Sequence, residues 1–278
     1  GVKELGATFR GEEMAIGTYV SRAVESEMSG NMIDLCPVGA LTSKPYRFKA
    51  RSWEMNDSDG VCPHCSVGCN TRVEHVQGEA KRVLPRTNEA VNEEWLCDKG
   101  RFGYEGTYHG RVEVPMIKHD GEWQEVPWST AFDAVSEGLK PRGPRLGVLV
   151  DPAATLEEMW LTQRIARALG AKDIDHRTHL ADAELDSRVS NSQPLLGTTL
   201  AGIEDHDAVL VVGGFPRQEQ PLINHRLHKV HKAGGAVAYL NPVAYRHNYR
   251  PAAEAVYGAG RDAAALAAVA AALGGQSA

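Results

Sequence analysis

Hydrophobic residues gather into short continuous runs in the second half of the chain, and polar or glycine residues bound each run. The runs that predict strands are 146–150, 208–212 and 236–240. Segments with a helical pattern lie at about 156–169, 221–232 and 262–273. Continuous apolar strands that alternate with helices are typical of a parallel sheet covered on both faces. We therefore predict an α/β fold with a doubly wound parallel sheet in the second half.

Two β-hairpins are predicted before residue 130, which indicates a small β-rich domain ahead of that sheet. Residues 71–74 and 81–84 flank Gln77-Gly78, and residues 112–117 and 123–126 flank Asp120-Gly121. A polar residue followed by Gly between two strand-like runs is typical of a tight hairpin. Further upstream, residues 1–55 show weak periodicity, and the polar stretch 56–60 is interpreted as a boundary between two units.

Composition narrows the classes of function. The chain has 278 residues, 42% of them hydrophobic and 24% charged, as in a folded protein of one or two domains. Its formal charge is -6 and it has no dense Lys/Arg cluster, so we expect no nucleic-acid partner. The longest strongly apolar stretch, 263–273, is far shorter than the about 20 residues of a membrane span. We therefore expect no direct membrane insertion. The first residues carry no initiator Met and no signal peptide, so we expect the chain to start in mid-protein.

Four of the five cysteines follow a C-x2-C-x3-C-x27-C spacing, at Cys62, Cys65, Cys69 and Cys97. Such clustering indicates metal ligation in a reducing compartment rather than disulfide bonds. Three thiolates on one loop and a distant fourth suit a 4Fe-4S cluster. A zinc-stabilised interaction module stays open, because tetrahedral sulfur sites suit either metal. His64, between two of these cysteines, is interpreted as a hydrogen-bonding or exposed side chain rather than a ligand.

Two stretches carry a family resemblance. Residues 62–104, which end in Trp-Leu-Cys-Asp-Lys-Gly-Arg-Phe-Gly-Tyr, resemble the iron–sulfur domain at the front of the molybdopterin oxidoreductase superfamily, and residues 111–131 look like its next elements. Residues 29–46, which contain Leu-Cys-Pro-Val-Gly-Ala-Leu-Thr, are similar to the G subunit of the proton-pumping NADH-quinone oxidoreductase, respiratory complex I. Within the superfamily, the chain therefore resembles the family of this G subunit.

The resemblance implies three regions. They are the C-terminal remnant of a ferredoxin-like iron–sulfur region (1–54), a 4Fe-4S domain of the Mo/W bis-MGD type (55–111), and a partial molybdopterin oxidoreductase-like α/β domain (112–278). It implies that Cys62, Cys65, Cys69 and Cys97 hold one 4Fe-4S cluster.

The resemblance also implies a role for two further residues, Cys36 and Lys99. Cys36 becomes the fourth ligand of a second 4Fe-4S cluster whose three other cysteines are missing from this chain, although a free buried thiol stays open. Lys99 lies close to the first cluster by this comparison, and a solvated surface lysine is the alternative.

The implied function is a one-electron relay within NADH:quinone oxidoreductase, from NADH and flavin towards quinone, with no bond chemistry and no catalytic residue in this chain. The implied partners are the flavin-bearing, NADH-binding subunit and the peripheral-arm iron–sulfur subunits, at the cytoplasmic side of the bacterial inner membrane. The resemblance implies that no molybdopterin is bound. The lack of any cysteine after Cys97 agrees with this, although a serine or aspartate ligand stays open. The alternative is the catalytic subunit of a molybdopterin-dependent oxidoreductase such as NAD-dependent formate dehydrogenase.

Three histidines recur at every third position of the predicted helix 221–232. They are His225, His228 and His231, and they alternate with basic residues. Without a nearby Cys, Asp or Glu triad, the sequence favours a solvated helix face over a metal site.

Overall fold

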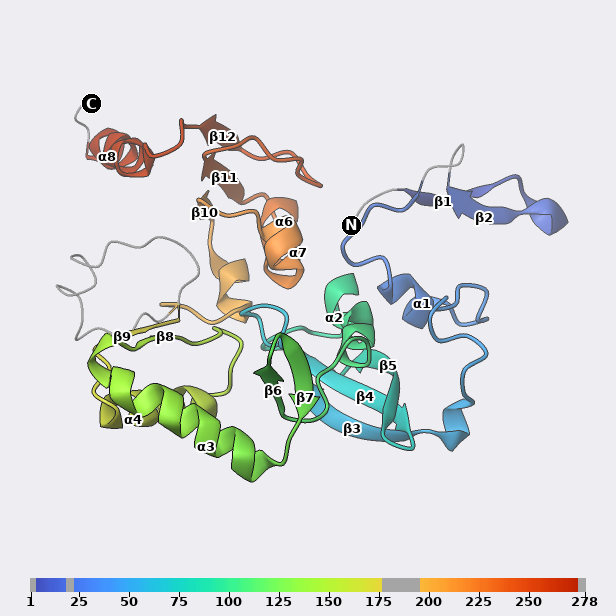
Figure 1. Cartoon of the computed structure of the whole chain (residues 1–278). Helices are drawn as coiled ribbons and strands as arrows, with labels where there is room; N and C mark the ends of the chain where they lie inside the picture. Colours follow the sequence, from blue (N-terminus) through green and yellow to red (C-terminus); the bar gives the residue numbers. More distant parts are fainter. Residues whose placement is uncertain (1–3, 19–22, 177–195, 275–278) are drawn as a thin grey trace. The chain divides into compact units, whose positions relative to one another are not determined.

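The computed structural model describes residues 4–18, 23–176 and 196–274 of the chain (Figure 1). Two compact units emerge: unit 1 combines residues 1–106 with 196–278, and unit 2 is formed by residues 107–195. The predicted α/β region 112–278 contributes to both units. The borders predicted after residues 54 and 111 separate the three regions that the resemblance implies. The division into two units does not test them, so they stay predictions.

The first segment of unit 1 is rich in antiparallel β-structure. Its elements are β1 (Leu5–Thr8), β2 (Ala15–Thr18), α1 (Asn31–Leu35), β3 (Asn56–Val61), β4 (Asn70–Val76), β5 (Glu79–Pro85) and α2 (Asp98–Phe102). Strands β1 and β2 form one hairpin, and β3, β4 and β5 form an antiparallel sheet in that order. The predicted turn is confirmed: Gln77 (φ 52°) and Gly78 (φ 83°) both adopt the positive φ that a two-residue hairpin turn favours.

Residues 56–60, which the sequence analysis interpreted as a polar, turn-rich stretch, instead form most of β3. The strand pairs with β4 along its whole length, from Asn56 opposite His75 to Val61 opposite Asn70. Five of its six residues are exposed, since β3 lies at the edge of the sheet. Polar side chains suit an exposed edge strand, and the backbone ladder rather than apolar burial stabilises it. The β1–β2 hairpin was also not predicted.

The second segment of unit 1 has the β–α–β arrangement that the apolar runs predicted. Its elements are a 3₁₀ turn η5 (Ala201–Asp205), β10 (Ala208–Val212), α6 (Pro216–Glu219), α7 (Pro221–Lys232), β11 (Ala236–Asn241), β12 (Ala253–Val256) and α8 (Asp262–Leu273). Strands β10, β11 and β12 lie parallel in that order, which confirms the α/β class. Strand β12 was missed by the sequence analysis.

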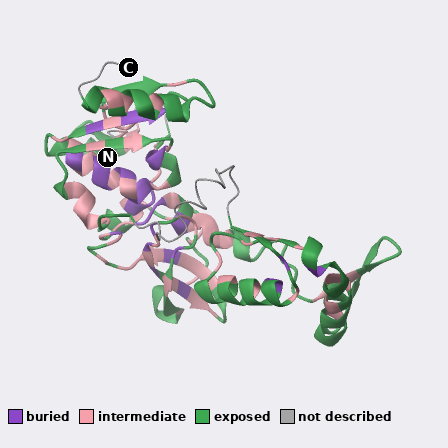
Figure 2. Cartoon of the chain, turned by 90° about the vertical axis from the view of Figure 1, so that its left-hand side faces the viewer, coloured by how far each residue is buried: buried purple, intermediate pink, exposed green. Residues whose placement is uncertain are grey.

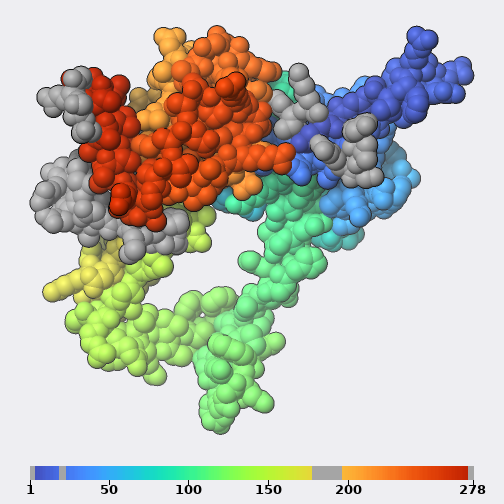
Figure 3. All heavy atoms as spheres, turned by 90° about the horizontal axis from the view of Figure 1, so that it is seen from above, coloured from blue at the N-terminus to red at the C-terminus, as the bar shows by residue number. Residues whose placement is uncertain are grey.

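Helix α7 packs on this sheet through a buried cluster of Leu227, Val230, Val237 and Tyr239. It also faces the first segment of unit 1, as hydrogen bonds from Gln220 to Ser66 and from Arg226 to the carbonyls of residues 89 and 91 show. In the space-filling view the orange atoms of this segment adjoin the blue and teal atoms of the first (Figure 3). The two segments of unit 1 therefore share an interface.

Unit 2 contains a hairpin and a short parallel pair. Its elements are β6 (Met116–His119), β7 (Glu122–Glu125), α3 (Trp128–Leu139), β8 (Gly147–Leu149), α4 (Leu156–Ala168) and β9 (Asp173–Asp175). Strands β6 and β7 form the second predicted hairpin, and β8 pairs with β9 in parallel. Helix α3 has no buried residue and α4 has only Ala166, so exposed residues predominate in both (Figure 2).

Among the described residues, no helix has both the length and the apolar character that a membrane crossing takes.

We expect Leu227→Ala to lower the free energy of unfolding by about 2–5 kcal/mol, because the side chain is buried between α7 and the sheet. Leu266→Ala in α8 is the control, since Leu266 is 44% exposed, and we expect it to cost less than about 1 kcal/mol. Urea unfolding of both variants measures the difference. Equal midpoints for the two variants would contradict the packing described for α7.

Candidate metal centre

Three of the spaced cysteines lie on the loop between β3 and β4. The backbone N–H of Cys62 donates a hydrogen bond of 2.8 Å to the carbonyl of Cys69, which closes the loop at its base. Gly68 adopts φ 63°, a left-handed conformation that glycine tolerates best. The loop therefore turns back within eight residues and brings Cys62, Cys65 and Cys69 to one apolar core.

The fourth cysteine reaches this core from the start of α2. Cys97 is the N-cap of the helix, and its Sγ accepts a hydrogen bond of 3.4 Å from the backbone N–H of Gly100. A Cβ at position 100 would lie 2.8 Å from Leu96 Cδ1 and 3.1 Å from Cys62 Sγ. The absence of a side chain at Gly100 thus lets α2 approach the loop closely.

All four cysteines belong to one apolar core. Cys62, Cys69 and Cys97 are buried within it and Cys65, half-buried, packs against it. Burial raises the pKa of the Cys62 and Cys97 thiols, and raises that of Cys69 to about 12. Neighbouring cysteine thiolates raise each of these pKa values further, so the sulfur atoms lie within electrostatic reach of one another. The structure therefore brings together the four residues that the spacing selected.

Sulfur donors in an apolar setting suit a soft metal centre that displaces the thiol protons. Within residues 4–18, 23–176 and 196–274, no three His, Cys, Asp or Glu side chains are grouped as closely as a single bound ion requires. Assignment of the four cysteines to a cluster rests on their shared core and their donor chemistry.

Cys36 lies outside that core, at the C-terminal end of α1. The backbone N–H of Leu41 contributes most to lowering the pKa of its thiol; desolvation opposes this effect, and the N–H groups of residues 38–40 add to it. The loop after α1 therefore favours a thiolate at Cys36. Its assignment as a ligand stays a prediction.

Lys99 and His64 border the cysteine core. Lys99 is exposed, yet its charge lowers the pKa of Cys62, against the larger rise that burial causes. Its side chain is thus both solvated and electrostatically coupled to the site. His64 is half-buried, and its Nε2 would clash with a Cβ at Gly103, so the imidazole packs against the end of α2.

Two buried asparagines hold the segment that leads into Cys97, and the sequence analysis missed both. Asn92, 1% exposed, accepts from the N–H of Asn70 at 2.8 Å and donates to the carbonyl of Trp95 at 3.2 Å. Asn31 donates to the carbonyl of Leu96 at 2.9 Å and accepts from its N–H at 3.1 Å. No local pattern marks these residues, because Asn70, which binds Asn92, and Leu96, which binds Asn31, lie far from them in the sequence.

The interpretation of the three histidines as a solvated face was wrong. His225 Nε2 lies 3.4 Å from Glu93 Oε2, and the rings of His228 and His231 stack on Tyr249 at centroid distances of 5.4 and 5.1 Å. The face that appeared exposed is covered by residues from two other segments. Burial lowers the pKa of His225, although Glu93 acts in the opposite direction.

Three protein-family models match the chain. They are "NADH-quinone oxidoreductase subunit 3, ferredoxin-like domain" over residues 1–42, "NADH-ubiquinone oxidoreductase NDSU1/NuoG-like, 4Fe-4S domain" over 59–105, and "Molybdopterin oxidoreductase" over 111–276. The last model covers more than half of the chain. Together the matches confirm the resemblance and support an iron–sulfur cofactor.

Curated relatives agree with this result. The chain is 39% identical over 228 residues to the G subunit of the NADH-quinone oxidoreductase of Rickettsia conorii, an alignment that covers 82% of this chain and 34% of that protein. It is 40% identical over 256 residues to the mitochondrial NADH dehydrogenase (ubiquinone) iron-sulfur protein 1 of Solanum tuberosum, across 90% of this chain and 34% of that protein. The chain spans about a third of the length of these relatives.

Among solved structures, the acetylene hydratase from Pelobacter acetylenicus matches with a TM-score of 0.46 and 16% identity. This match covers 66% of the present chain and 27% of that chain.

Acidification should destabilise unit 1 through His228. Burial lowers the pKa of His228 from the usual 6.5 to about 4. Between these values the unfolded chain binds more protons than the folded chain, so the free energy of unfolding falls as the pH drops from about 6.5 towards 4. In His228→Phe, which keeps a ring against Tyr249, we expect a weaker pH dependence.

Urea unfolding at pH 7, 6 and 5 measures this dependence. His109→Gln is the control, because His109 is exposed and its replacement should leave the slope as in the wild type. An unchanged slope in His228→Phe would show that this ring does not couple protonation to folding.

Proposed function

The chain belongs to the molybdopterin oxidoreductase family, and we propose that it is the iron–sulfur electron-transfer subunit of a proton-pumping NADH:quinone oxidoreductase. One observation carries the proposal: Cys62, Cys65, Cys69 and Cys97 meet in a single core within the stretch that matches a 4Fe-4S domain. The ferredoxin-like family model over residues 1–42 and the names of the relatives point to the same complex.

These four cysteines are the proposed ligands of one 4Fe-4S cluster. When bound, such a cluster accepts and releases one electron at a time without making or breaking a substrate bond. The chain therefore needs no catalytic acid, base or nucleophile. Its residues act on the cluster through burial, hydrogen bonds to sulfur and nearby charge.

Each of these influences has a named source in the structure. The backbone N–H of Gly100 donates to Cys97 Sγ, and that of His64 lowers the pKa of Cys62, so both favour the thiolate form that binds metal. The exposed Lys99 places a positive charge within reach of the site, which stabilises added negative charge. The buried apolar core opposes that added charge.

Cys36 is the proposed fourth ligand of a second cluster. The N–H groups of residues 38–41 that lower its pKa also suit a metal-bound thiolate. Its three partners would have to come from outside the sequence given. The three modules 1–54, 55–111 and 112–278 remain the proposed organisation, with the last serving as scaffold without molybdopterin.

The proposed partners are other subunits of the same complex: the flavin-bearing, NADH-binding subunit and the iron–sulfur subunits of the peripheral arm. We propose a peripheral position at the cytoplasmic side of the bacterial inner membrane. The names of the relatives favour this complex over a formate dehydrogenase.

Cys65→Ser should abolish the cluster or convert it to a form with less iron, because serine is a poor substitute for a thiolate and the three remaining thiolates leave one iron unligated. Since metal binding contributes to folding, we expect the melting temperature to fall by about 5 °C or more. Iron analysis, visible absorption and thermal unfolding of anaerobically prepared protein measure the effect.

Cys36→Ser is the matched control, as Cys36 lies outside the cysteine core. It should keep the iron and the visible absorption of the four-cysteine cluster. Wild-type iron content in Cys65→Ser would show that Cys65 is not a ligand, and stoichiometric molybdopterin in the wild type would favour the formate dehydrogenase class instead.

A further inference from the structure

The first turn of α7 lies against the core that holds the four cysteines. Leu222, 3% exposed, belongs to the same buried cluster as three of the cysteines. Just before the helix, Gln220 Nε2 donates a hydrogen bond of 3.0 Å to Ser66 Oγ, inside the cysteine loop. A segment far along the chain therefore supplies one wall of the proposed cluster site.

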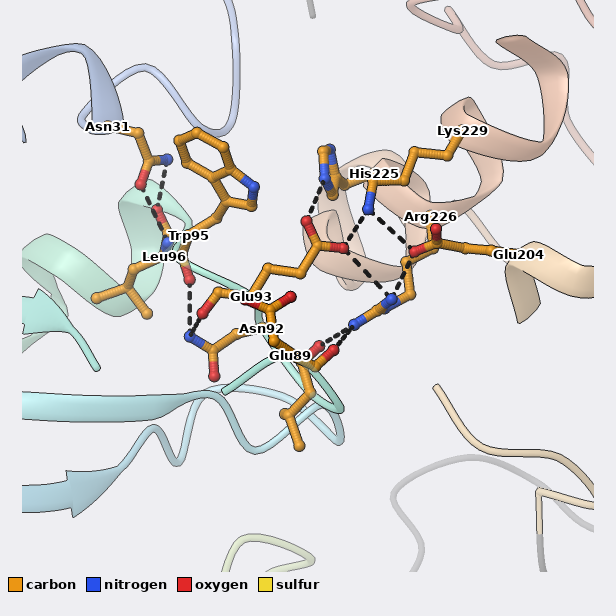
Figure 4. Close-up of polar contacts among 11 residues, drawn as sticks. Asn31, Glu89, Asn92, Glu93, Trp95, Leu96, Glu204, His225, Arg226 and Lys229 are labelled. Carbon is orange, nitrogen blue, oxygen red and sulfur yellow. Dashed lines mark hydrogen bonds and ion pairs between the residues drawn. The ribbon is translucent and has the colours of Figure 1, made fainter. Parts of the chain in front are cut away.

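A network of charged side chains joins the middle of α7 to the segment that leads into Cys97 (Figure 4). Arg226 Nη1 lies 2.5 Å from Glu204 Oε1 and 3.3 Å from Glu93 Oε1. Lys229 Nζ lies 3.1 Å from Glu204 Oε1 and also pairs with Glu93. Two carboxylates thus face two permanent cations, which balances the charge of a partly buried network.

Arg226 does more in this network than supply a charge. Its side chain is 4% exposed, and its Nη2 donates to the backbone carbonyls of Glu89 at 2.9 Å and Val91 at 3.1 Å. These carbonyls belong to the segment that continues to Cys97. The planar guanidinium therefore fixes the backbone of that segment to the helix, a geometry that the ammonium of a lysine does not reproduce.

Two apolar residues, Trp95 and Leu96, connect this contact with α7 to the proposed ligand Cys97. The rings of His225 and Trp95 meet edge to face with centroids 6.2 Å apart, and Trp95 packs against the cysteine core. Leu96, which follows, is fully buried in that core and precedes Cys97. Displacement of α7 would therefore open the wall beside Leu222 and loosen the segment that delivers Cys97.

We propose that Leu222 and Arg226 are positioning residues for the cluster: together they hold the α7 wall of its site closed and keep water out. This inference rests on the proposed four-cysteine cluster. Reduction adds negative charge, which a dry apolar site disfavours, so entry of water raises the reduction potential. Loss of a nearby positive charge acts in the opposite direction. A rise in the reduction potential of a variant therefore indicates that water enters the site, whereas a fall indicates the loss of a positive charge.

The test uses the full chain, prepared anaerobically with its iron, and four variants: Leu222→Ala, Arg226→Met, Arg226→Lys and Lys229→Met. Potentiometric titration followed by electron paramagnetic resonance gives the reduction potential, and iron release to a chelator gives the opening of the site. Leu222→Ala and Arg226→Lys keep the net charge. Lys229→Met is the control, because it removes one charge from the same network without removing a bond to the backbone. Among the described residues, Lys229 donates to the carboxylates of Glu93 and Glu204 and to no backbone carbonyl.

We expect a higher potential and iron release at least about fivefold faster in Leu222→Ala, Arg226→Met and Arg226→Lys. Lys229→Met should show a lower or unchanged potential and release within about twofold of the wild type. If Arg226→Met does not fold, Leu222→Ala and Arg226→Lys decide the question.

Reduction potentials and iron-release rates equal to those of the wild type in both Leu222→Ala and Arg226→Lys would overturn the inference. They would leave the proposed four-cysteine cluster unaffected. A lower potential in Arg226→Met, with Arg226→Lys unchanged, would show that Arg226 acts only through its charge and would overturn its positioning role. A wild-type chain without iron would instead contradict the proposed function, and the two failures are thereby distinct.

Discussion

The gathering of four sulfur donors at one apolar core, three of them buried in it, is the constraint on which the rest of unit 1 depends. The raised pKa values of Cys62, Cys69 and Cys97 show that this core disfavours free thiolates. A bound metal centre compensates because it takes the place of the thiol protons. Ligand binding and folding are then linked, since the same residues form the hydrophobic core and the site.

Three separate parts of the chain converge on that core. The β3–β4 sheet presents one loop, α2 presents Cys97, and α7 closes the site with Leu222. The buried asparagines and the Arg226 network hold these parts in register through backbone carbonyls, which constrain position more strictly than apolar contact does. The proposed relay role requires no catalytic group; it depends on the geometry, burial and charge around the cysteines.

Elements set by local patterns could be predicted from the sequence. Apolar runs gave β10 and β11, and the turns at Gln77-Gly78 and Asp120-Gly121 gave both hairpins, because each depends on neighbouring residues. The cysteine spacing likewise identified four residues that share a core. Strand β3 escaped prediction because an edge strand needs a partner rather than an apolar face. The partial burial of the α7 histidines could not be predicted, because Glu93 and Tyr249, which contact them, lie in other segments of the chain.

The most direct test of the account is the metal content and magnetic state of the anaerobically prepared wild-type chain. Iron and sulfide analysis, combined with electron paramagnetic resonance before and after reduction, should find about four irons per chain and one paramagnetic centre that appears on reduction. A colourless protein that carries one zinc ion and shows no such signal would contradict it.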